Sequence, residues 1–293
     1  MKGQFKARKY IVNENYFNSV NNDESAYILG FISADGGVFD NALTIGQSSD
    51  KGKELLEWIK SKLDSDHVLY YRPPKKETHN YCNVLTITSP KIVSDLNNFN
   101  IDEQKKYNYK FPDNLNLNLF KQFLRGYFDG DGCVGVYDEK GERNGKIYLS
   151  RYLKLSFYGT IDFIEKCKVL IPIKGHITYS KNKTHCEIIW TNKKAREFGK
   201  WLFENNNQLP LYVKSKKYFE YINEFNNTIP LNVRTSKKIS QFNKNNEFIK
   251  TYDSAADANR ILGISATSIS SCISGKLKIA GGFIWRFKNV EEE

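Results

Sequence analysis

Two stretches of the sequence decide the fold, because they repeat each other. YILGFISADGG (residues 27–37) and FLRGYFDGDGC (residues 123–133) align without a gap. Gly30 and Gly126 lie 96 residues apart, and so do Asp35 and Asp131. An internal repeat indicates a repeated structural unit. The two stretches therefore predict that the chain contains two similar halves.

Both stretches have the apolar spacing of a helix, and each helix is expected to end at a glycine. The pairs Gly30/Ala34 and Gly126/Gly130 place small residues four positions apart, on one face of each helix. A glycine inside a helix costs about 0.5–1 kcal/mol relative to alanine. Its use in the same register in both copies indicates a packing reason, so we expect the two helices to pack against each other through these faces.

Asp35 and Asp131 end the two helices, where free carbonyl oxygens and the helix dipole disfavour negative charge. A single Asp-Gly pair is normally a turn with its carboxylate in water, but two such pairs beside small-residue faces favour a functional role. If the helices pack in parallel, the carboxylates converge near a pseudo-two-fold axis. A divalent cation with hard oxygen ligands would relieve their repulsion, and Mg²⁺ is the ion that this pair predicts.

The segments after each helix repeat one order of elements. Strand-like alternation at 43–47 precedes a helix begun by Ser49 or Asp50, a strand pair within 67–88 and a helix from Pro90. The second half repeats this order with strands within 146–157, a helix after Thr160, strands near 176–180 and 186–190, and a helix at 193–203. We predict an α+β fold of two pseudo-two-fold related αββαββα halves with a small C-terminal module.

The predicted divisions are an N-terminal arm (1–22), a first half (23–115), a second half (116–229), a linker (230–237) and a C-terminal module (238–293). In the module, strands at 239–242 and 248–252 precede helices at 255–262 and 266–273, which a turn at Gly263 joins. This spacing is typical of a helix-turn-helix, although a purely structural helical hairpin has the same pattern.

The composition favours a polyanionic partner. The 293 residues include 44 Lys and Arg against 33 Asp and Glu, a net charge of +11. Residues 238–288 hold eight basic and three acidic residues, a net charge of +5. The polar positions of the expected strands would add a basic, hydrogen-bonding sheet face, although for any one residue solvation is the simpler interpretation. The residues in question are Tyr70, Arg72, Lys154, Tyr179 and Lys181.

Other classes of protein are disfavoured. The chain has no apolar run of the roughly 18 residues that a membrane span needs and no apolar signal-peptide core, so we expect no membrane partner and no secretion. The five cysteines include no C-x-x-C pair, which argues against a disulfide framework or a zinc ribbon. The four histidines form no H-E-x-x-H motif. A catalytic metal would therefore have to be bound by carboxylates.

The two helices resemble the LAGLIDADG motif, and residues 13–229 resemble a single-chain, two-motif LAGLIDADG homing endonuclease. The resemblance implies a DNA-binding saddle and a metal-dependent site in which Asp35 and Asp131 bind metal. It also implies that the backbone carbonyls of Ala34 and Gly130 contribute to the metal site.

The same resemblance implies further active-site residues. A lysine from each half would lie beside the scissile phosphates, and Lys105 and Lys217 are the nearest matches, each with neighbouring lysines. Gln47 matches a residue that orients active-site water. The second half has Phe157 and Tyr158 near the corresponding place, which implies an asymmetric role for the glutamine.

The C-terminal module resembles the nuclease-associated modular DNA-binding domain through residues 253–258, 269–272, 275–276 and 281–286. The resemblance implies that its second helix presents short polar side chains to DNA while two lysines meet phosphates. These residues are Thr267, Ser268, Ser271, Lys276 and Lys278.

Together these observations predict a monomeric, site-specific endonuclease that cuts both strands of a long, non-palindromic DNA target and initiates intron mobility. The expected cofactor is Mg²⁺, with Mn²⁺ as a substitute and Ca²⁺ as an ion that binds without supporting cleavage. The expected location is the cytoplasm of a bacterial or phage-infected cell, or an organelle, with no obligate protein partner. The alternatives are an RNA maturase that assists intron splicing and a non-catalytic DNA-binding regulator on the same scaffold.

Overall fold

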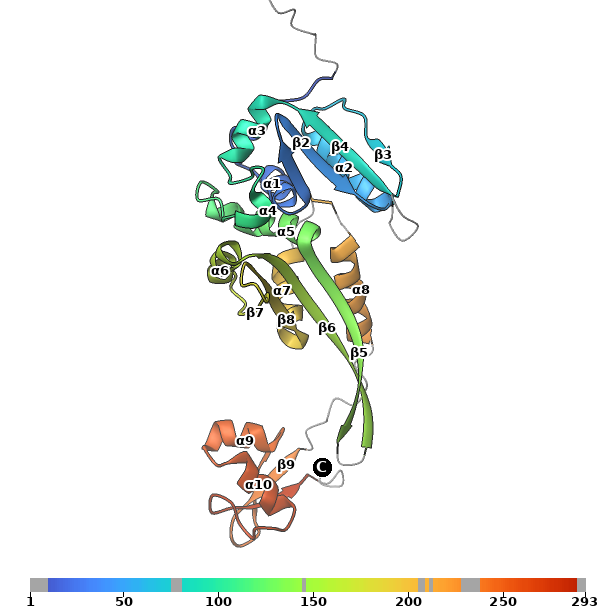
Figure 1. Cartoon of the computed structure of the whole chain (residues 1–293). Helices are drawn as coiled ribbons and strands as arrows, with labels where there is room; N and C mark the ends of the chain where they lie inside the picture. The colour runs from blue at the N-terminus through green and yellow to red at the C-terminus, as the bar shows by residue number, and fades with distance from the viewer. Residues whose placement is uncertain are drawn as a thin grey trace, which may run out of the picture. The chain divides into compact units, whose positions relative to one another are not determined.

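The computed structural model describes residues 10–74, 81–143, 146–204, 209–210, 213–227 and 238–288. The chain divides into two compact units, residues 1–223 and residues 224–293, and each unit is described by itself (Figure 1). In the part of the chain that is described, no helix combines the length and the apolar character that a bilayer span requires.

The first half of the larger unit is a four-stranded antiparallel sheet with the strand order β1-β2-β4-β3. Leu43 and Ile45 alternate with less buried residues and face the helices that cover one side of the sheet. The other side of the sheet remains open. The elements in chain order are α1 (Asp23–Asp35), β1 (Gly36–Phe39), β2 (Ala42–Gln47), α2 (Asp50–Lys62), β3 (Tyr70–Arg72), β4 (Cys82–Thr88) and α3 (Pro90–Asn97).

The second half repeats this arrangement, with the strand order β5-β6-β8-β7. Its elements are α5 (Phe120–Asp131), β5 (Gly132–Arg143), β6 (Lys146–Thr160), α6 (Ile161–Leu170), β7 (His176–Tyr179), β8 (His185–Thr191) and α7 (Asn192–Phe203). A short helix, α4 (Lys105–Asn108), lies in the connection between the halves, and α8 (Val213–Asn227) follows the second half. The predicted fold class, with two αββαββα halves, is confirmed.

The two motif helices lie side by side between the two sheets (Figure 1). A Cβ added at Gly30 would overlap the backbone carbonyl of Phe123, and one added at Gly126 would overlap that of Tyr27. Further along, a Cβ at Gly130 would overlap the Cβ of Ala34. The successive contacts run in the same direction along both helices. The helices therefore pack against each other through their small-residue faces, as the repeat predicts, and they do so in parallel.

The smaller unit contains a three-stranded antiparallel sheet with the order β10-β9-β11 and two helices. Its elements are β9 (Ile239–Phe242), β10 (Phe248–Tyr252), α9 (Ala255–Leu262), α10 (Ala266–Ile273) and β11 (Ile284–Phe287). Gly263 ends α9 in the left-handed region, with φ of 72°, which suits glycine. Trp285 is 1% exposed in the core of the unit. The predicted linker at 230–237 lies outside the described residues.

The close packing of α1 against α5 makes a stability prediction. Gly30→Ala should lower the free energy of unfolding by about 2 kcal/mol, because the added methyl group forces two packed backbones apart. Urea denaturation measures the change. Gly37→Ala is the matched control, since a Cβ at that exposed strand residue would come no closer than 4.0 Å to the neighbouring atoms. Equal losses in both variants would contradict the role assigned to Gly30.

Candidate active site

Asp35 and Asp131 come together where α1 and α5 end. A Cβ built on Gly130, the residue before Asp131, would lie 3.4 Å from the Asp35 carboxyl carbon. The charge of Asp35 raises the pKa of Asp131, which is the effect of a like charge close by. The parallel packing of the two helices thus brings the two carboxylates to one site.

The free carbonyl groups at the end of α1 accept hydrogen bonds from Lys105, on α4. Its Nζ donates to the carbonyl oxygens of Ile32 (3.1 Å), Ser33 (2.7 Å) and Ala34 (2.9 Å). The last carbonyls of a helix lack partners within the helix and carry partial negative charge. An ammonium group satisfies both requirements, so Lys105 stabilises the end of α1.

Lys214, near the start of α8, occupies the corresponding place at the end of α5. Its Nζ donates to the carbonyl oxygens of Phe128 (3.1 Å) and Gly130. These residues are the repeat equivalents of Ile32 and Ala34, each 96 positions further on. The positive charge that the sequence requires at the two helix ends is therefore supplied, in this structure, by a pair of lysines related by the repeat.

Each lysine interacts with charges on both helices, and for Lys214 the strongest is Asp129 on α5, the helix it caps, followed by Asp35 on α1. Burial lowers the pKa of Lys105 to about 8, while the charge of Asp131, followed by that of Asp35, raises it. Burial also lowers the pKa of Lys214. On the pKa of Asp35, Lys214 has a larger lowering effect than Lys105. The two aspartates and the two lysines therefore form one group of interacting charges.

The two aspartates have raised pKa values for partly different reasons. Partial burial is the main cause in both cases, because it disfavours the charged form. A hydrogen bond from Gln47 lowers the pKa of Asp35 and offsets part of the effect. For Asp131 the second cause is the charge of Asp35, which raises its pKa further. Perturbed titratable groups in a cleft are typical of functional sites.

Gln47, from the first half, contacts only one of the two aspartates. Its Nε2 donates to Asp35 Oδ2 at 2.6 Å. Gln47 lies two residues after Ile45, which pairs with the first residue of β1. In the second half, Phe157 pairs with the first residue of β5, so the equivalent of Gln47 is Gly159, one residue beyond the expected Phe157–Tyr158. The strand position of the glutamine carries no side chain in the second half, where a hydrogen bond with the Tyr127 hydroxyl lowers the pKa of Asp131 instead.

The two carboxylates fit a divalent cation that also needs ligands from a substrate. Among the described residues, no group of three or more His, Cys, Asp or Glu side chains could enclose a metal. Mg²⁺ is commonly held by one or two carboxylates together with substrate phosphates, and this donor set is of that kind. The carbonyls of Ala34 and Gly130 accept lysine hydrogen bonds and each keep a second lone pair.

The structure brings Lys214 to the site and leaves Lys217 exposed on α8. Both belong to one lysine-rich run, and the sequence alone offers no means of choosing between them. Asp129, two residues before Asp131, has a structural role: it accepts a hydrogen bond from Tyr27 Oη at 2.9 Å and is 1% exposed. In the first half, Ser33 Oγ accepts the equivalent bond from Tyr109 Oη at 2.8 Å.

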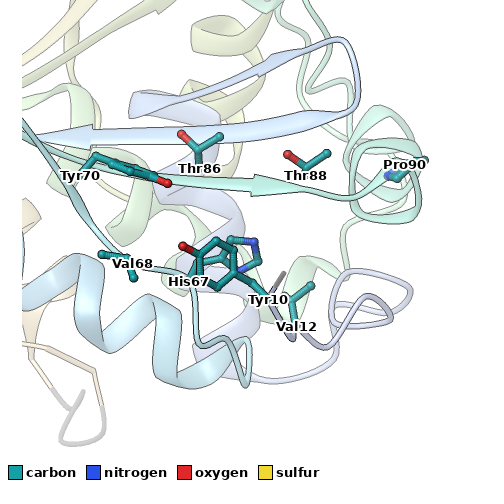
Figure 2. Close-up of a pocket in the computed structure, with 8 residues that line it drawn as sticks. All are labelled: Tyr10, Val12, His67, Val68, Tyr70, Thr86, Thr88 and Pro90. Carbon is teal, nitrogen blue, oxygen red and sulfur yellow. The ribbon is translucent and has the colours of Figure 1, made fainter. Parts of the chain in front are cut away.

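The residues predicted on the sheets fall on different faces. Tyr70 and Arg72 lie on the open face of their sheet, opposite Val84 and Cys82 in the strand register. Tyr70 also lines a cavity of about 400 Å³ whose walls come from the N-terminal arm and the first half (Figure 2). That cavity includes neither Asp35 nor Asp131 among its lining residues.

In the second half, Lys154 lies on the open face and pairs with Glu187 at 3.1 Å. Tyr179 pairs with Cys186 on the opposite, helix-covered face, where its hydroxyl donates to Glu165 on α6 at 2.8 Å. Lys181 is exposed in the turn after β7. The structure therefore separates Tyr179 from the other sheet residues, because one step in strand register reverses the face of a side chain.

The predicted residues of the small unit lie on or after α10. Ile269 and Cys272 are the buried residues of this helix. Thr267 is exposed, Ser268 and Ser271 are half-buried, and Lys276 and Lys278 are exposed in the segment that follows. The arrangement leaves a polar side of α10 open to a ligand.

One family model and several solved structures are similar to parts of the chain. The family model described as "DNA endonuclease I-HmuI-like, NUMOD-like domain" matches residues 245–286, which include β10, α9 and α10. No curated protein sequence matches the chain.

Solved structures similar to the chain include several LAGLIDADG endonucleases. The I-LtrWI homing endonuclease bound to target DNA is 17% identical, with 74% of this chain and 92% of that chain covered and a TM-score of 0.49. I-GzeII in complex with its DNA target is 15% identical, with coverages of 71% and 91% and a TM-score of 0.49. I-SmaMI bound to uncleaved DNA with calcium ions is 15% identical, with coverages of 69% and 89% and a TM-score of 0.44. All three scores lie below 0.5, so these similarities extend no function to the chain.

The burial of Lys105 makes a prediction about its titration. Lys105 should lose its proton at a pH of about 8, below the ordinary lysine value of 10.5, so it is charged below that pH and neutral above it. A ¹³C NMR titration of the lysine side chains measures this. Asp131→Asn should lower the pKa further, because it removes a charge that favours the ammonium form. Titration of Lys105 at the ordinary value would contradict its burial.

Proposed function

We propose that the chain is a LAGLIDADG-type homing endonuclease that hydrolyses one phosphodiester bond in each strand of a double-stranded DNA target. The observation that carries the proposal is the pair Asp35 and Asp131 at the adjoining ends of α1 and α5, with a lysine ammonium beside each helix end. The backbones of a DNA duplex are antiparallel and related by dyads. Two related halves in one chain therefore offer one acidic group to each strand.

The proposed roles follow from the chemistry of each side chain. Asp35 and Asp131 hold divalent cations, with Mg²⁺ as the working ion, Mn²⁺ as a substitute and Ca²⁺ as an ion that binds without supporting cleavage. A cation bound there supplies Lewis-acid stabilisation of phosphoryl oxygens and acidifies water. Lys105 and Lys214 present positive charge to the scissile phosphates, and Gln47 holds one oxygen of Asp35 in place.

The DNA duplex is proposed to lie on the open faces of the two sheets, where Tyr70, Arg72 and Lys154 are found. The net charge of +11 supports a polyanionic partner. Since the two halves differ in sequence, each half can recognise a different half-site, and the target need not be a palindrome. The chain would act as a monomer where its target lies, in a cytoplasm or an organelle, and initiate intron mobility.

The small unit is proposed to add a second DNA contact. The family-model match over residues 245–286 supports this role, as does the net charge of +5 between residues 238 and 288. The N-terminal part of the second helix of a helix-turn-helix contacts base edges in the major groove. Thr267, Ser268 and Ser271 would make such contacts from α10, while Lys276 and Lys278 would meet phosphates.

The decisive experiment is cleavage of the host gene without its intron. In the presence of Mg²⁺ the protein should linearise a plasmid that carries this gene. Asp35→Asn and Asp131→Asn should each slow the formation of linear DNA by roughly 100-fold or more, because each removes a charged oxygen ligand needed in the transition state. Agarose gel electrophoresis of timed samples measures both effects.

Asp40→Asn is the matched control, since Asp40 lies in the turn between β1 and β2. This variant should cleave like the wild type. Full cleavage by both active-site variants would refute the assignment of the two aspartates. Specific binding of intron RNA by a protein that leaves the plasmid intact would favour a maturase. Specific DNA binding without cleavage would favour a regulator.

The module lysines make a separate prediction. The double variant Lys276→Ala/Lys278→Ala should weaken DNA binding and lower the slope of log affinity against log salt by about 2, since each phosphate contact contributes about 0.9 to that slope. Fluorescence anisotropy at several salt concentrations, in Ca²⁺, measures this. Lys193→Ala, an exposed lysine on α7, is the control. An unchanged slope would exclude both lysines from the DNA interface.

A further inference from the structure

The two halves differ at one sheet position beside the carboxylates. In the first half, Gln47 contacts Asp35, and the equivalent residue in the second half is Gly159. A Cβ at Gly159 would lie 2.9 Å from the hydroxyl oxygen of Tyr127 and 3.1 Å from a ring carbon of Phe163. Buried aromatic rings therefore occupy the space of a side chain, and no amide can reach Asp131 from this position.

Gly159 also lines an open cavity that includes Asp131. The cavity has a volume of about 430 Å³. Its walls include Lys105, Asp131, Tyr158 and His185 together with Gly159. A histidine from β8 thus shares a cavity with Lys105 and Asp131, whereas Asp35 and Lys214 are not among the residues that line it.

His185 is held on several sides. Its ring stacks on Tyr158, with centroids 5.4 Å apart and planes at 4°. Nε2 lies 3.1 Å from the backbone carbonyl oxygen of Lys106, and Nδ1 lies 3.0 Å from Thr184 Oγ1. A carbonyl oxygen can only accept, so Nε2 donates to Lys106, while Nδ1 shares a hydrogen bond with the Thr184 hydroxyl. Both ring nitrogens therefore have a hydrogen-bond partner.

The carbonyl that His185 contacts belongs to Lys106, the residue after Lys105. Both lysines lie on α4, a helix of only four residues whose N-cap side chain makes no capping hydrogen bond. Helices this short depend on tertiary contacts for their stability. Tyr109 anchors the C-terminal side of α4 through its hydroxyl bond to Ser33, and His185 anchors the helix itself.

The site consequently divides into two chemically different sets. One contains Asp35 and Gln47, with Lys214 as the lysine that acts more strongly on the acid. The other contains Asp131 and Lys105, which line one cavity, with His185 fixing the helix that carries the lysine. The repeat gives the two sets a similar geometry. Gln47 hydrogen-bonds the acid of the first set directly, whereas His185 holds the helix that carries the lysine of the second set.

We propose that His185 is a positioning residue that holds Lys105 in place, and that it supports cleavage of one DNA strand while Gln47 supports cleavage of the other. The proposal rests on the proposed endonuclease function. His185 does not touch the reacting phosphate. It acts through the α4 backbone, so its loss should disturb Lys105 while Lys214 keeps its hydrogen bonds to the end of α5.

The test compares the two strands of one substrate. A target duplex carries a different 5′ fluorophore on each strand, and the rate of cleavage is measured for each. His185→Phe keeps a ring to stack on Tyr158 and removes the donor to Lys106, so it should slow one strand by about fivefold, the size expected for one lost hydrogen bond. Gln47→Ala should slow the opposite strand. His185→Gln, which retains an N–H donor, should restore most of the lost rate.

A second measurement needs neither DNA nor metal. The amides of Asn108 and Tyr109 bond to the carbonyls of Gln104 and Lys105, so their hydrogen exchange reports on α4. In His185→Phe their exchange should be faster than in the wild type, while His176→Phe should leave both exchange and cleavage unchanged. His176 is an exposed histidine on β7 of the same sheet.

Equal slowing of both strands by His185→Phe, or unchanged exchange in α4, would overturn the positioning role. The thermal midpoint of each variant separates these results from unfolding. A wild-type protein that cuts neither strand would refute the proposed function and with it the division of the strands. Even then, the exchange measurement alone would decide whether His185 holds α4.

Discussion

The close approach of α1 and α5 is the contact on which the rest of the structure depends. Gly30 and Gly126 allow the backbone of each helix to touch that of the other, where any side chain would overlap a carbonyl group. The helices therefore end at the same level. Each sheet begins directly after its helix, so the position of both sheets follows from this contact. The two carboxylates meet for the same reason.

Bringing two helix ends together also concentrates negative charge. Two aspartates and the last carbonyls of two helices share one small region. Lys105 and Lys214 compensate by donating to those carbonyls, at the cost of partial burial of two ammonium groups. This balance leaves acids with raised pKa values beside lysines with lowered ones. The pKa values of such acids and lysines change strongly when a cation or a phosphate binds beside them.

The repeat does not extend to every contact. The β5–β6 ribbon is longer than the β1–β2 hairpin, and β6 extends beyond its pairing with β8. Gly159 stands where the first half has Gln47, and His185 contacts α4 from one sheet only. A shared framework thus carries two different environments around equivalent acids. A DNA target whose two half-sites differ in sequence would therefore contact two protein halves that also differ in sequence.

The sequence by itself determined the repeat, the order of elements, the packing of the two motif helices through their small-residue faces, and the bounds of α9 and α10, while the parallel direction that brings Asp35 and Asp131 together came from the structure. These features follow from local periodicity, small-residue spacing and turn residues. Only the tertiary structure decided that Lys214 meets the end of α5, that Tyr179 faces α6 and that His185 holds α4. Each of these contacts joins separate elements, and its geometry depends on how the elements pack, which local patterns do not encode.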